Sequence, residues 1–88
     1  MLTDEERSAQ QKRLARYLRD ARRIKRLSQA ELAKRIGRTQ SFVTKYENEA
    51  RSLDAVTLLE VCNVLRVNES ELIDYVRGKF DARPHSER

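Results

Sequence analysis

The chain has 88 residues, with 19 Lys and Arg against 14 Asp and Glu, so its formal net charge is +5 at pH 7. This length accommodates one small domain with one modest core, which excludes large multidomain enzymes. Only two glycines and one proline accompany 38% charged residues, a composition that favours long helices over the turn-rich pattern of a sandwich or barrel. We therefore expect an all-α domain.

The composition also limits location and chemistry. No apolar run has the roughly 18 to 20 residues of a membrane-spanning helix, and the acidic start does not resemble a signal peptide, so we expect a soluble cytoplasmic protein with no membrane contact. One cysteine, Cys62, and one histidine, His85, cannot supply a zinc site, and Cys62 fits a buried core position. We expect no metal or other cofactor. Because the sequence lacks an acid–base pair, an activated nucleophile and a glycine-rich phosphate loop, we do not expect an enzyme.

The charge is distributed unevenly along the chain. Residues 7–26 hold nine basic residues and one acid, whereas residues 52–76 hold one basic residue and five acids. A domain polarised in this way would turn its positive face towards a polyanion, although solvated helix faces explain the same pattern. The basic run upstream of Leu14 has the same two interpretations.

Two helices are predicted in the first part of the chain. Thr3 and Glu6 form a capping pattern, which predicts a long helix from about residue 4 to residue 25. Its apolar stripe comprises Leu14, Tyr17, Leu18, Ala21 and Ile24. Ser28 and Glu31 repeat the capping pattern and open a short helix whose inward face is Leu32, Ala33 and Ile36.

Three further helices are predicted after Gly37, which ends the second helix. Thr39 caps a third helix over residues 40–47, with Phe42, Val43 and Tyr46 on one side. Asp54 caps a fourth helix, with its stripe at Leu58, Leu59, Cys62 and Leu65. Asn68 with Glu71 opens a fifth, whose apolar residues are Leu72, Ile73, Val76 and Phe80. These four apolar residues are more than the end of a small domain needs to close its own core, so we expect them to form a homodimer patch. We expect residues 80–88 to form a flexible tail.

Residues 28–47 have the spacing of a helix-turn-helix motif within one domain at residues 1–79. Only Gly37 and Arg38 separate the second helix from the Thr39 cap, and Gly37 suits a turn that requires positive φ. Ala33 stands where the two helices cross and a larger side chain would separate them. In such motifs the second helix is presented to the DNA major groove.

The stretch from Leu27 to Arg51, LSQAELAKRIGRTQSFVTKYENEAR, resembles the lambda-repressor-like (Xre-type) helix-turn-helix family. The resemblance extends from about Leu18 to Leu72. It implies a compact five-helix DNA-binding domain, here with an extended N-terminal helix. It also implies a dimeric transcription regulator of bacterial or phage origin.

The resemblance implies roles for individual residues. Base or groove contacts are expected from Thr39, Gln40, Ser41, Thr44 and Lys45, whose side chains suit base edges. Phosphate contacts are expected from Ser28, Gln29, Arg38, Asn48 and Arg51. Phe42 has two interpretations, a position at the core margin or a contact with a thymine methyl group.

Arg22 and Glu47 match a family pair that braces the third helix against the first. The sequence departs from the family pattern at Arg26, Glu49, Ala50 and Leu53. Many relatives have glycine where this chain has Arg26 and Glu49, and proline where it has Leu53. We therefore expect the two loops to follow a different path.

The function predicted from these features is a sequence-specific DNA-binding transcription regulator, acting as a repressor. A homodimer would bind an inverted-repeat operator of double-stranded DNA. Two alternatives share this domain, namely an antitoxin with a toxin as protein partner and a restriction-modification controller protein. A protein-interaction module on the same fold is a third alternative, which the polar residues of the third helix disfavour.

Overall fold

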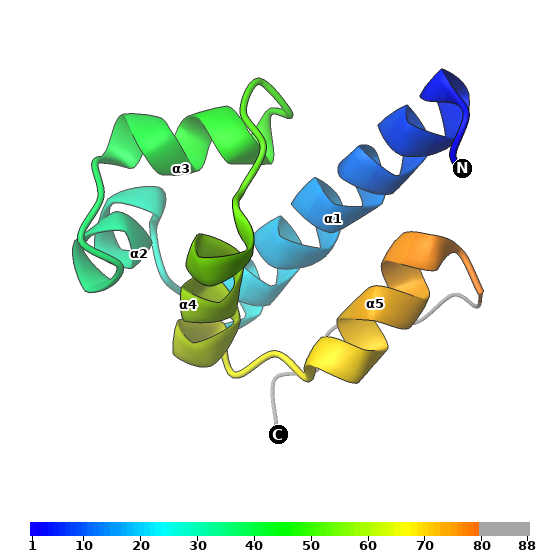
Figure 1. The fold of residues 1–88 in the computed structure, drawn as a ribbon. Coiled ribbons are helices and arrows are strands. Elements are labelled where there is room, and N and C mark those ends of the chain that lie inside the picture. Colours follow the sequence, from blue (N-terminus) through cyan, green and yellow to red (C-terminus); the bar gives the residue numbers. More distant parts are fainter. Residues whose placement is uncertain (80–88) are drawn as a thin grey trace.

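The computed structural model describes residues 1–79, which form five α-helices and no strand. In chain order these are α1 (Asp4–Ile24), α2 (Gln29–Arg35), α3 (Gln40–Glu47), α4 (Ala55–Leu65) and α5 (Glu69–Arg77). Figure 1 shows α2 and α3 together at one side of the molecule, whereas α5 lies at the opposite side along the N-terminal half of α1. The expected all-α, five-helix fold is confirmed.

Every helix begins at the residue that the capping patterns predict. Thr3 and Ser28 form complete capping boxes, with Glu6 and Glu31 returning a bond to the cap backbone. The side chains of Thr39, Asp54 and Asn68 each accept a hydrogen bond from the backbone N–H three residues later. These bonds satisfy amides that lack a partner within the helix.

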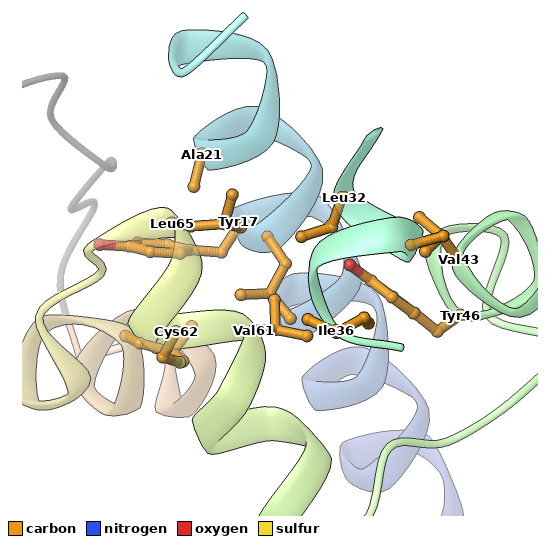
Figure 2. Packing of buried hydrophobic residues seen from close by; sticks show 12 residues of the cluster. Tyr17, Ala21, Leu32, Ile36, Val43, Tyr46, Val61, Cys62 and Leu65 are labelled. Carbon is orange, nitrogen blue, oxygen red and sulfur yellow. The ribbon is translucent and has the colours of Figure 1, made fainter. Parts of the chain in front are cut away.

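One hydrophobic core joins the helices (Figure 2). Tyr17 and Leu18 of α1, Leu32 of α2, Val43 of α3 and Val61 of α4 are each at most 1% exposed. Cys62 belongs to the same cluster, and burial raises the pKa of its thiol to about 11. A protonated, buried thiol of this kind is a small apolar core residue.

Two apolar positions differ from the prediction. Leu59 is 54% exposed, because the buried face of α4 is formed by Val61 and Cys62 and Leu59 lies outside that face. Leu72 is only 3% exposed and packs in the core, so it is not part of an exposed patch. Phe80 and the predicted tail lie outside the described residues.

Arg13 and Tyr17 of α1 hold α5 in place. The rings of Tyr17 and Tyr75 lie 5.3 Å apart, and Arg13 Nη1 donates to the carbonyl oxygen of Val76 at 2.8 Å. This arginine therefore satisfies one of the carbonyl groups left free at the C-terminal end of α5. Over residues 1–79, no helix has both the length and the apolar character needed to cross a membrane.

Candidate DNA interface

Helices α2 and α3 pack closely through a tight turn. Ala33 is 2% exposed, and the Arg38 backbone N–H donates to its carbonyl oxygen at 2.9 Å. Gly37 has φ +69°, which glycine adopts without a Cβ penalty. The turn therefore delivers the chain into the Thr39 cap, and α3 begins one residue later.

The outer face of α3 is polar and solvent-exposed. Gln40, Ser41 and Lys45 are exposed, and none of the three has a side-chain hydrogen bond or ion pair among the interactions of residues 1–79. Thr39 is also exposed, but its hydroxyl oxygen accepts the Phe42 backbone N–H at 3.2 Å. Three of the five predicted base-contacting side chains are thus free to meet an external partner.

The C-terminal end of α3 is fixed by a buried ion pair. Arg22 Nε donates to Glu47 Oε2 at 2.7 Å, and Arg22 Nη2 donates to Glu47 Oε1 at 3.0 Å. Arg22 Nη1 also donates to the carbonyl oxygen of Leu27 at 2.7 Å. The bond to Glu47 raises the pKa of Arg22 despite the opposing effect of burial. The two residues expected to brace α3 against α1 therefore lie in direct, bidentate contact.

Gln29 extends this pair into a network that reaches α3 a second time. Its amide nitrogen donates to Glu47 Oε1 at 3.0 Å, and its amide oxygen accepts from the Thr44 hydroxyl at 2.6 Å. Thr44 is half-buried, so its hydroxyl points to α2 and not to the outer face of α3. One amide hydrogen of Gln29 is left for an external acceptor.

The remaining residues predicted to contact phosphate lie at the start of α2 and at the two ends of α3. Ser28 caps α2, while Asn48 caps the C-terminal end of α3 and is exposed. Arg38 and Arg51 are exposed residues whose guanidinium carbons lie 5.1 Å and 4.6 Å from the centre of the Phe42 ring. Phe42 itself is half-buried and packs against the core, which places it at the core margin.

One residue with a structural role near the interface was not predicted. Thr57 is 1% exposed, and its hydroxyl accepts a bond from Arg38 Nη2 at 3.1 Å. In the sequence, the one local feature that indicates a structural role for Thr57 is its position three residues after the Asp54 cap. Tyr46 is buried on the predicted apolar side of α3, and its hydroxyl has no hydrogen-bond partner among residues 1–79; burial raises the pKa of this hydroxyl.

The loops that depart from the family pattern keep a glycine-like backbone. Arg26 has φ +59° and Glu49 has φ +65°, both in the left-handed region that glycine favours. At these two residues, the expectation of a different path is not met. The side chains are accommodated at the cost of strain, since L-residues rarely adopt this conformation.

Comparison with known proteins agrees with this geometry. The family model described as helix-turn-helix matches residues 18–72, the segment that contains α2, α3, α4 and most of the core. The search of curated proteins found no match. The matched segment covers more than half of the chain, and the chain belongs to the DNA-binding, lambda-repressor-like (Xre-type) helix-turn-helix family.

Proposed function

We propose that the protein is a sequence-specific regulator that reads DNA with α3 in the major groove. The exposed polar face formed by Gln40, Ser41 and Lys45 carries this proposal, because these side chains suit base edges and have no other partner among the described residues. Glutamine can bind adenine in a bidentate manner, and lysine favours the acceptors of guanine. A protein-binding surface on α3 would be expected to be apolar or acidic.

We assign the backbone contacts to residues around this face. The phosphates are contacted by Ser28, Gln29, Arg38, Asn48 and Arg51. Thr39, the N-cap of α3, adds a contact in the groove. Thr44 supports α3 through Gln29, and its methyl group is the part available to thymine. Residues 1–79 act together as the DNA-binding unit.

We place the dimer contact on α5, away from the reading helix (Figure 1). Ile73 is 48% exposed and borders a groove of about 290 Å³ between α1, α4 and α5. The other residues lining this groove are Gln10, Leu14, Leu58, Leu72, Val76 and Arg77. A second copy that buries Ile73 against this groove would form a self-complementary, two-fold interface.

Introducing a charge at the proposed dimer contact tests the dimer separately from DNA reading. Ile73→Glu should give a folded monomer in sedimentation experiments, because an exposed residue does not support the monomer's own core. Val56→Glu is the matched control, since Val56 is 69% exposed on α4 and does not line the groove. A wild-type chain that sediments as a monomer at all accessible concentrations would contradict the dimer.

Selection from a random duplex pool tests the function itself. A dimer of this family with α3 in successive major grooves should enrich an inverted repeat whose half-sites are roughly 34 Å apart. Occupying such a site in a promoter blocks transcription, so a reporter with the selected repeat should be repressed when the protein is expressed. Enrichment of no sequence over bulk competitor would contradict specific reading.

A further inference from the structure

Phe42 lies on the flank of α3 with an arginine from each neighbouring loop beside its ring. Arg38 comes from the turn before α3 and Arg51 from the loop after it, with guanidinium carbons 5.1 Å and 4.6 Å from the ring centre. The ring is held from the core side by Tyr46, with the two ring centres 6.1 Å apart at an interplanar angle of 72°. One fixed aromatic ring therefore contacts two cationic side chains.

Arg38 has a second anchor on α4. Its Nη2 atom donates to the hydroxyl of Thr57 at 3.1 Å, and Thr57 is 1% exposed. The backbone N–H of Thr57 in turn donates to the Asp54 side chain at 2.8 Å. The guanidinium of Arg38 is thus located between the first turn of α4 and the Phe42 ring.

Neither arginine forms an ion pair within residues 1–79, although Asp54, whose carboxyl pKa is lowered first by hydrogen bonds with Thr57, is near enough for Arg38 to lower that pKa further. The ion pairs found there are Arg19–Asp20 and Arg22–Glu47, so no carboxylate lies within 4.0 Å of either Arg38 or Arg51. Two like charges are therefore held near one ring, at the edge of the helix proposed to enter the groove. Such an arrangement favours an anion with several oxygen acceptors.

We propose that Phe42 is a positioning residue that holds Arg38 and Arg51 ready for the phosphates of the DNA backbone. This inference rests on the proposed function, since it requires a duplex bound along α3. In this arrangement the Phe42 ring packs against two guanidinium groups and Tyr46, so we assign it to holding the arginines and not to a thymine methyl group. Ordering these long side chains before binding reduces the entropy lost on binding.

A mutant cycle tests the arrangement on the duplex selected by the wild-type chain. Phe42→Leu should weaken binding about fivefold, equally for the selected duplex and an unrelated one, because phosphate contacts carry no sequence information. In the Arg38→Ala, Arg51→Ala background the same change should alter affinity by less than about twofold, because the side chains it orders are absent. Phe42→Tyr keeps the ring and should bind as the wild type does.

The free protein offers a readout without DNA. Ring-current shifts of the Arg38 and Arg51 side-chain signals should be present in the wild type and Phe42→Tyr but absent in Phe42→Leu. Thermal unfolding of each variant separates lost folding from lost positioning.

Three results would overturn the proposal while leaving DNA binding intact. They are an unchanged affinity in Phe42→Leu, an equal loss with and without the two arginines, and a changed base preference at one position. A wild-type chain that binds no duplex would instead contradict the proposed function, and the positioning role with it.

Discussion

Glu47, the last residue of α3, is bound by both Nε and Nη2 of Arg22 from α1, at 2.7 Å and 3.0 Å. Their side chains are 2% and 9% exposed, so the pair is shielded from solvent. Since Gln29 joins the same carboxylate, one buried charge connects α1, α2 and α3. The orientation of α3 therefore depends on a contact that is buried inside the domain.

Arg22→Ala should destabilise the fold strongly. It leaves the Glu47 carboxylate buried without its cation, a change that typically costs about 3–5 kcal/mol in the free energy of unfolding. Arg19→Ala is the matched control, because the Arg19–Asp20 pair is partly exposed and 3.8 Å apart, and such pairs contribute about 0–1 kcal/mol. Urea denaturation measures both, and equal losses would contradict the bracing role of Arg22.

Thr44→Val tests the hydroxyl that Thr44 donates to Gln29 at 2.6 Å. The change keeps the shape of the side chain but leaves the amide oxygen of Gln29 without this donor, so we expect a loss of about 1 kcal/mol. Ser41→Ala removes an exposed hydroxyl from the same helix and should stay within about 0.5 kcal/mol of the wild type. A Thr44→Val variant as stable as Ser41→Ala would show that the network does not support α3.

Glu49→Gly should stabilise the protein. Glu49 has φ +65°, and an L-residue in the left-handed region is strained by roughly 1–2 kcal/mol. Glycine removes this strain, but its greater conformational freedom in the unfolded chain offsets part of the gain in stability. We expect a net gain below about 1 kcal/mol. The control is Glu60→Gly at an exposed position inside α4, which should cost about 0.5–1 kcal/mol. Thermal unfolding should move the two midpoints in opposite directions.

Stability should fall in acid through two capping carboxylates. Backbone hydrogen bonds at Ser28 and Thr57 lower the pKa of Glu31 and of Asp54 below their ordinary values of 4.5 and 3.8. As pH falls, the unfolded chain therefore binds protons at these two carboxylates before the folded chain does. The stability that the ionised carboxylates contribute is complete above their ordinary pKa values and is lost as pH falls through their lower pKa values in the folded chain.

Amide variants provide the check on that acid response. Glu31→Gln and Asp54→Asn keep a side-chain oxygen that can accept the backbone N–H but remove the titration. Urea midpoints measured from neutral to acidic pH should decline less steeply in the double variant. An unchanged slope would mean that other groups cause the acid loss.

The helix boundaries were predictable because they are encoded locally. Thr3, Ser28 and Thr39 are cap residues whose partners lie three positions along the chain, so a short stretch of sequence contains the whole interaction. The predicted stripe of α4 was wrong at Leu59, because Leu58, Cys62 and Leu65 are equally compatible with a stripe through Val61. Only packing against the other helices selects Val61.

The details of the site depend on contacts between distant segments. The direction of the Thr44 hydroxyl follows from how α2 and α3 cross, which spacing alone does not reveal. Arg26 and Glu49 give no local sign of positive φ, because their residue types rarely adopt it. The hydrogen bond of Arg38 to Thr57 likewise joins the turn before α3 to α4, 19 residues further along the chain.

We propose that α3 reads bases directly through Gln40, Ser41 and Lys45. The most direct test of this proposal is selection from a random duplex pool with the wild type, Gln40→Ala and Lys45→Ala, with Lys79→Ala as an exposed lysine control outside α3. We predict that each α3 variant loses preference at one or two symmetric positions of the inverted repeat while Lys79→Ala leaves the repeat unchanged. An identical repeat from all four proteins, or weakening that is uniform over every sequence, would contradict direct reading by α3.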